Sequence, residues 1–79
     1  MDFMTSIREV VFRTHQSARE ISLALGKPYS TLLRECNPYD KGAKLGAETL
    51  FQIMKETGNV EPLRWMAENL GYDLIKKEI

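Results

Sequence analysis

The sequence predicts an all-α fold, and two observations indicate that class. Apolar residues recur at helical spacing in five segments, and each segment has a start or stop signal at an end. No segment combines period-two alternation with an enrichment in β-branched residues, the pattern of a strand. Because 79 residues suffice for one domain only, we expect a compact five-helix domain over residues 1–72 and a short tail over residues 73–79.

The first helix is predicted over Thr5–Arg13. Ser6 and Glu9 have the spacing of a capping box, in which the hydroxyl accepts from an N–H three residues on and the Glu side chain reaches back. Its inward face is expected to consist of three apolar residues, namely Ile7, Val10 and Val11.

The second helix is predicted over Ala18–Leu25, and the third over Tyr29–Glu35 or one residue further. Ser17 and Glu20 repeat the capping-box spacing at the start of the second helix. Gly26 follows the last apolar residue of this helix, where a left-handed cap is expected. The inward positions of the two helices are small or apolar: Ala18, Ile21, Ser22, Leu25, Leu32, Leu33 and Cys36.

Two short helices joined by a tight turn at glycine are typical of a helix-turn-helix, which places its second helix in the major groove of DNA. Residues 17–37 meet its requirements for a small residue at the crossing, a glycine at the turn and apolar residues that fix the angle. We therefore expect helix 29–35 to enter the groove.

The fourth helix is predicted over Ala47–Thr57, and the fifth over Pro62–Leu70. Gly58 and Gly71 follow their last residues and are expected to stop them. Their apolar faces are expected to consist of Leu50, Phe51, Ile53 and Met54 in the fourth helix, and of Leu63, Met66, Ala67 and Leu70 in the fifth.

Polar, basic and aromatic side chains near the turn are the candidate DNA contacts: Gln16, Ser17, Lys27, Tyr29, Ser30, Thr31, Arg34, Lys41 and Lys44. Arg34 can offer a bidentate fork to guanine O6 and N7 or hold a phosphate. Ser30 and Thr31 can donate to phosphates or base edges, and the remaining residues suit backbone contacts, which position the protein.

Each candidate also has a purely structural interpretation. Ser30 and Thr31 suit the first turn of a helix, and Arg34 suits a surface ion pair with Glu35 or Glu20. Tyr29 suits the edge of the core. Loop lysines such as Lys41 and Lys44 are commonly solvated.

Net charge is zero, whereas DNA-binding proteins often have a basic footprint. The charge is unevenly distributed, however. Residues 1–44 contain seven Lys and Arg against five acids, and residues 45–79 contain four against six. Because local charge governs contact with phosphates, this split is compatible with a basic DNA-binding side.

Composition argues against several other classes. One cysteine, Cys36, and one histidine, His15, are too few for an internal disulfide or a four-ligand zinc site, so we expect no metal and no cofactor. No apolar run approaches a membrane span, and the N-terminus lacks the features of a secretory signal, so we expect a cytoplasmic protein. No catalytic motif is present, so we expect neither enzyme activity nor a small-molecule substrate.

An alternative function is a non-enzymatic protein-interaction module with an apolar C-terminal face. Trp65 lies off the predicted inward stripe of its helix, so it is a candidate for an exposed anchor unless it covers the side of the core. The candidate interface consists of Trp65, Leu74, Ile75 and Ile79. A small domain gains stability from self-association, and a dimer would present two groove-binding helices about one DNA turn (~34 Å) apart.

Three segments of the chain resemble the phage CII-type regulatory proteins of temperate phages and prophages. They are KPYSTL at Lys27–Leu32, NPYDKGAKLG at Asn37–Gly46, and TGNVEPLRWMAENLGY at Thr57–Tyr72. The resemblance implies a lambda-repressor-like helix-turn-helix domain that binds double-stranded DNA at an operator or promoter, self-associates and acts at the nucleoid of a bacterial host. It also implies that Asp40 accepts backbone N–H groups in a structured loop.

Overall fold

The computed structural model describes residues 2–13 and 17–78, and it contains five α-helices with no strand among these residues. The helices are α1 (Phe3–Arg13), α2 (Ala18–Leu25), α3 (Tyr29–Glu35), α4 (Ala47–Thr57) and α5 (Glu61–Leu70). The prediction of a compact all-α fold is confirmed. The predicted bounds of α2, α3 and α4 are also confirmed, whereas α1 begins two residues earlier and α5 one residue earlier than predicted.

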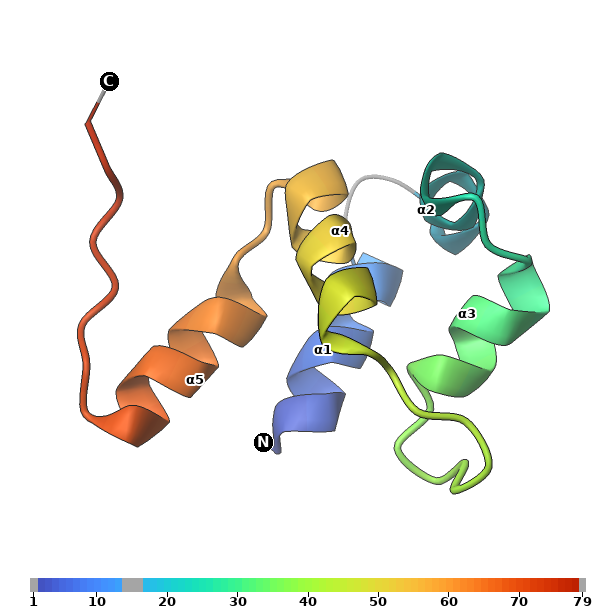
Figure 1. Ribbon diagram of the computed structural model, residues 1–79, viewed down its shortest axis with the longest axis horizontal. Coiled ribbons are helices and arrows are strands. Elements are labelled where there is room, and N and C mark those ends of the chain that lie inside the picture. The colour runs from blue at the N-terminus through green and yellow to red at the C-terminus, as the bar shows by residue number, and fades with distance from the viewer. Residues whose placement is uncertain (1, 14–16, 79) are drawn as a thin grey trace.

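Helices α1 and α4 form the middle of the molecule (Figure 1). Helix α5 packs against α1 on one side, and α2 contacts α1, α4 and α3 on the other. The α2–α3 pair therefore lies at the opposite end of the molecule from α5 (Figure 1). Residues 72–78 follow α5 without helix or strand.

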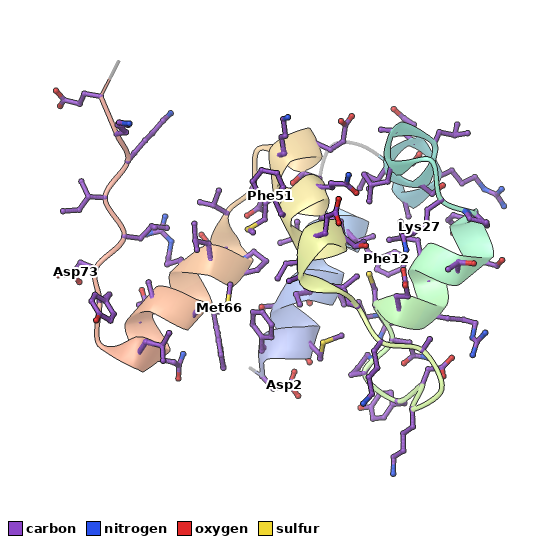
Figure 2. The ribbon with its side chains drawn as sticks, viewed as in Figure 1. Asp2, Phe12, Lys27, Phe51, Met66 and Asp73 are labelled. Atoms are coloured by element: carbon purple, nitrogen blue, oxygen red, sulfur yellow. The ribbon has the colours of Figure 1, made fainter. Side chains whose placement is uncertain are left out.

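The core is built from the apolar faces of the first four helices. Its buried apolar residues are Ile7, Val10, Val11, Ala18, Ile21, Leu32, Cys36, Leu50 and Ile53. Met66 of α5 packs against this cluster and points from α5 toward α1 (Figure 2). Every predicted inward residue of α1 is confirmed, because the i, i+3, i+4 spacing keeps these side chains on one face.

The capping box predicted at Ser6 and Glu9 is wrong. Helix α1 begins earlier, and Asp2 Oδ1 accepts the backbone N–H of Thr5 at 2.7 Å. Ser6 is buried within the helix, where its hydroxyl donates to the carbonyl oxygen of Phe3 at 2.7 Å. Aspartate is as good an N-cap as serine, so the start of α1 moves to the first cap available.

The capping box predicted at the start of α2 is confirmed. Ser17 Oγ accepts the N–H of Glu20 at 3.1 Å, and the Glu20 carboxylate accepts from the N–H of Ser17.

The predicted inward faces of α4 and α5 are wrong in part. Phe51 is 59% exposed, and the buried face of α4 instead includes Thr57, whose hydroxyl donates to the carbonyl oxygen of Ile53. In α5, Leu63 and Leu70 are exposed, whereas Trp65 is half-buried with its ring 5.1 Å from that of Phe3. The face of α5 that packs toward α1 and the core therefore includes Trp65 and Met66.

No helix in the described part of the chain has the length and apolar character needed to cross a membrane.

Candidate nucleic-acid interface

The turn between α2 and α3 has the backbone geometry that its sequence predicts. Gly26 has φ +68°, the left-handed conformation that glycine adopts without a Cβ penalty, and its N–H donates to the carbonyl oxygen of Leu23 at 3.1 Å. The N–H of Lys27 donates to the carbonyl oxygen of Ser22 at 3.0 Å. Pro28 precedes the first residue of α3 and needs no N–H there. These bonds complete the end of α2 and set the direction in which α3 leaves the turn.

Buried side chains fix the angle between the two helices. Ile21 on α2 and Leu32 on α3 are both 0% exposed. Ser22 is a small residue of α2 that is only 3% exposed, and its hydroxyl donates to the carbonyl oxygen of Arg19 at 2.7 Å. The orientation of α3 is therefore determined by the core.

Cys36 follows α3 and belongs to the core. It is 0% exposed, and burial raises the pKa of its thiol to about 11. A thiol with this pKa is almost entirely protonated at neutral pH and is a poor nucleophile or metal ligand. In residues 2–13 and 17–78, no cluster of His, Cys, Asp and Glu is suited to hold a metal ion.

The outer face of α3 consists of candidate DNA contacts. Ser30 and Arg34 are exposed, and Thr31 is half-buried. Leu32 and Cys36 occupy the opposite, buried face. The amphipathic pattern thus orients a short polar surface outward from a helix whose other side is held by the core.

Lys27 is less available than the sequence suggested. Its ammonium lies between α2 and α3 (Figure 2), 2.9 Å from Oε1 and 3.2 Å from Oε2 of Glu35. The two side chains are only 25% and 15% exposed. This ion pair joins the turn to the last residue of α3, so Lys27 has a structural partner within the unit.

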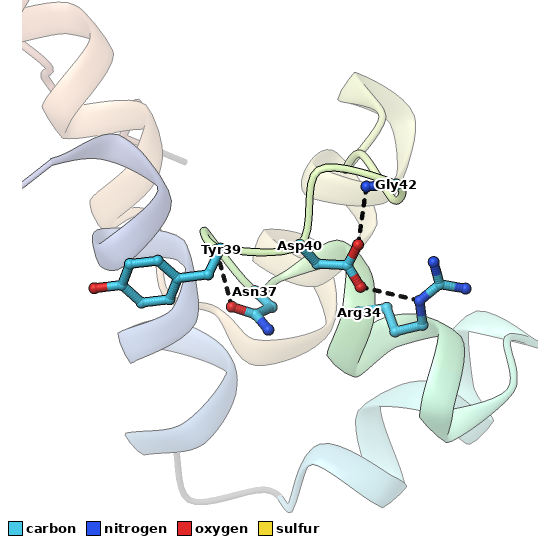
Figure 3. Close-up of polar contacts among 5 residues, drawn as sticks. All are labelled: Arg34, Asn37, Tyr39, Asp40 and Gly42. Atoms are coloured by element: carbon cyan, nitrogen blue, oxygen red, sulfur yellow. Dashed lines mark hydrogen bonds and ion pairs between the residues drawn. The ribbon is translucent and has the colours of Figure 1, made fainter.

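The side chain of Arg34 contacts neither Glu35 nor Glu20, the partners considered from sequence. Its Nε donates to Oδ2 of Asp40 at 3.0 Å, in the loop that follows α3 (Figure 3). The Arg34 hydrogen bond, together with the N–H of Gly42 that donates to Asp40 Oδ1 at 2.9 Å, holds the pKa of this carboxyl below its usual range. The expectation that Asp40 accepts a backbone N–H is therefore confirmed.

The ring of Tyr29 packs against the core, in agreement with its structural interpretation. The guanidinium of Arg19 lies over this ring, 4.4 Å from its centroid. This cation–π contact places a second arginine, from α2, beside the start of α3.

The remaining candidates differ in their surroundings. Lys41 and Lys44 are exposed in the loop between α3 and α4. The hydroxyl of Ser17 is engaged in the α2 capping box. Gln16 lies outside the described residues.

The residues of the candidate C-terminal interface differ in their exposure and do not form one exposed group. Trp65 packs on Phe3, Leu74 is half-buried, and Ile75 is 86% exposed. Ile79 lies outside the described residues. Leu70 and Tyr72, which were not candidates, add exposed apolar surface to the same end of the molecule, at 74% and 71%.

Sequence reasoning missed two contacts near this surface. One is the contact of Arg19 with Tyr29, and the other is the ion pair of Asp40 with Arg34. Arg19 meets Tyr29 ten positions along the chain, and Arg34 meets Asp40 six positions along it, and neither separation is a helical one. The one signal in the sequence was that basic and acidic residues both lie near the turn at Gly26, which indicates ion pairs without naming the partners.

The fold and this site define a small all-helical protein in which a core-anchored helix presents a polar and basic face. The family model described as phage regulatory protein CII (CP76) matches residues 2–78, and the chain belongs to this family. A search of curated proteins found no match, and a search of solved structures found none either. The chain is thus a member of a phage regulatory family, as its sequence motifs indicated.

Proposed function

We propose that this chain is a sequence-specific DNA-binding transcription regulator of phage or prophage type that inserts α3 into the major groove. The observation that carries the proposal is the division of α3 into a buried face, with Leu32 and continued by Cys36 just after the helix, and an outer face with Ser30 and Arg34. A recognition helix needs this combination, because its angle must be fixed while its polar side chains reach the bases.

The proposed roles follow from exposure and chemistry. Arg34 contacts a guanine, and Ser30 and Thr31 contact base edges or phosphates near the start of α3. Lys41 and Lys44 are exposed and contact the flanking phosphate backbone. Arg19, which is exposed on α2, contacts a phosphate of the DNA backbone.

Three other sequence candidates have weaker support as DNA contacts. Lys27 is bound to Glu35, Tyr29 contributes to the packing of the unit, and Ser17 caps α2. We assign these three residues to the support of the α2–α3 pair. The proposal places the protein in the bacterial host at the DNA, without enzyme activity.

The test is a binding-site selection from random duplex DNA, followed by gel shifts at several stated salt concentrations. We expect the wild type to prefer a selected duplex over a scrambled one and to lose affinity as salt increases. Arg34→Ala should reduce that preference about tenfold, since a bidentate contact to guanine contributes about 1–3 kcal/mol.

Arg64→Ala is the matched control for this substitution. Arg64 is also a surface arginine paired with an acid, Glu61, at 3.2 Å, but it lies on α5 at the far end of the molecule. An equal effect of the two substitutions would contradict the role proposed for α3, and a wild type without sequence preference would contradict the proposed function.

We also propose that the chain self-associates through its C-terminal end. Leu70, Tyr72 and Ile75 are strongly exposed there, and exposed apolar patches commonly mark interfaces. The same surface supports the alternative function of a protein-interaction module. A homodimer or higher oligomer would supply two copies of α3 for a pair of half-sites.

Analytical ultracentrifugation tests self-association. The wild type should sediment as a dimer or larger species at tens of micromolar, and Ile75→Glu should shift it toward monomer. Leu23→Glu, at an 80% exposed position on α2, is the matched control and should leave the oligomer unchanged. A monomeric wild type at this concentration would contradict the proposal.

A further inference from the structure

We propose that Asp40 is a positioning residue for sequence recognition: it holds the Arg34 guanidinium in the orientation in which its outer edge faces a guanine. This inference rests on the proposed function and adds a specificity determinant outside α3. It concerns the loop contact between Arg34 Nε and Asp40 Oδ2, at 3.0 Å.

The contact uses the inner side of the guanidinium. Nε is the nitrogen nearest the chain, and Figure 3 shows the two terminal nitrogens of Arg34 on the side that points away from the Asp40 carboxylate. Recognition of guanine O6 and N7 needs two N–H groups in a planar fork. Asp40 can therefore hold the arginine through Nε and leave both terminal nitrogens outside this ion pair.

The two side chains differ in exposure in the way this role requires. The Arg34 side chain is 61% exposed, whereas that of Asp40 is only 23% exposed. The carboxylate is thus set back toward the protein, and the guanidinium lies outside it. A carboxylate that lay further out than the guanidinium would instead repel the phosphates of an approaching duplex.

Asp40 is itself fixed by the backbone of its loop. Its Oδ1 accepts the N–H of Gly42 at 2.9 Å, and its own N–H donates to the carbonyl oxygen of Asn37 at 3.2 Å. The Asn37 side chain is not one of these contacts, since its Oδ1 accepts the N–H of Tyr39 at 3.0 Å and makes no bond to Asp40 (Figure 3). The loop therefore determines where the carboxylate lies before any ligand arrives.

The guanidinium lies close to the loop at Gly42. A Cβ at this position would be 3.4 Å from both Arg34 Nη2 and Asp40 Oδ1, the near limit of ordinary contact. Arginine is a long side chain that loses much rotamer freedom when it binds, and a contact that orders it beforehand reduces that loss.

The experiment compares binding of the full chain to two duplexes, one selected by the wild type from random DNA and one scrambled. In Asp40→Asn, one of the two carboxylate oxygens becomes an NH2 donor, so the side chain no longer presents an acceptor to both Gly42 N–H and Arg34 Nε. We expect the preference for the selected duplex to fall about fivefold, part of the discrimination that one bidentate contact provides. Affinity for the scrambled duplex should stay the same or increase, because a negative charge is removed.

Two variants distinguish positioning from a general effect on the loop. Asn37→Ala removes the bond to Tyr39 N–H but leaves the Arg34–Asp40 pair, and it should keep the wild-type preference. In an Arg34→Ala background, Asp40→Asn should have no further effect, because its role passes through the arginine. Circular dichroism of each variant should match that of the wild type.

The inference would be overturned by an unchanged preference in Asp40→Asn, or by tighter binding of the selected duplex, which would make Asp40 a competitor for Arg34. It would also be overturned by a fivefold loss that persists without Arg34, or that Asn37→Ala reproduces. In all these cases the proposed function stands if the wild type still prefers its selected duplex. A wild type without any preference contradicts the proposed function and this inference together.

Discussion

Replacing Leu32 by alanine tests whether α3 owes its position to the core. Leu32 is 0% exposed, and full burial of a leucine side chain contributes about 1.5–3 kcal/mol. The cavity left by the truncation raises the usual loss for Leu→Ala to about 2–5 kcal/mol. Because α3 has only seven residues and ends in a loop, it can partly settle into the space, so we expect a loss near 3 kcal/mol.

This loss is large for a chain of this size. At about 0.05–0.15 kcal/mol per residue, a 79-residue domain has a total stability of about 4–12 kcal/mol. Urea unfolding followed by far-ultraviolet circular dichroism should give a midpoint about 2–3 M lower than that of the wild type, for a slope of about 1–1.5 kcal/mol/M.

The matched control is Leu23→Ala, which makes the same chemical change at an 80% exposed position of α2. Its stability should stay within about 0.5 kcal/mol of the wild type. If the two leucine variants differed from each other by less than that amount, Leu32 would not anchor α3 and the argument for a core-determined recognition helix would fail.

Three further outcomes are expected from the same physical reasoning. Ser17→Ala should lower the free energy of unfolding by about 1 kcal/mol through loss of the α2 cap, whereas Ser30→Ala should change it little; urea titration measures both. The lowered pKa values of Asp2 and Asp40 mean that their stabilisation is present above the ordinary value of 3.8 and is lost as pH falls through the folded-state pKa. The thermal midpoint should therefore decrease at acid pH, less steeply in Asp2→Asn, and equal slopes would refute this. The Cys36 thiol, with a pKa of about 11, should react with iodoacetamide at pH 8 far more slowly in the native state than in urea, and equal rates would show that it is not buried.

The fold was predictable where local chemistry decides it. The cap at Ser17, the glycine at position 26 and the proline at position 28 define the ends of α2 and the start of α3 through bonds within a few residues. Helix α1 was predicted less well, because two acceptable caps, Asp2 and Ser6, stand four residues apart and local rules do not choose between them.

The faces of α4 and α5 were harder to predict, because helical spacing admits more than one apolar stripe. Phe51 and Leu70 belong to stripes that the sequence favours, yet both are exposed. In α4 the buried residues Leu50, Ile53 and Thr57 share one face, and Phe51 lies beside that face. In α5 the ring of Trp65 contacts that of Phe3, which is 62 positions away, and Leu70 is left exposed. No local pattern reports a partner at that separation.

The candidate site divides in the same way. The sequence by itself determined that α2 and α3 form with a tight turn between them, and that Ser30 and Arg34 fall on the side of α3 opposite Leu32, because capping and helical period act over a few residues. Only the tertiary structure decided which charges meet. Glu35 pairs with Lys27 rather than with Arg34, and Arg34 pairs with Asp40, because the path of the loop after α3 brings that carboxylate back to the helix.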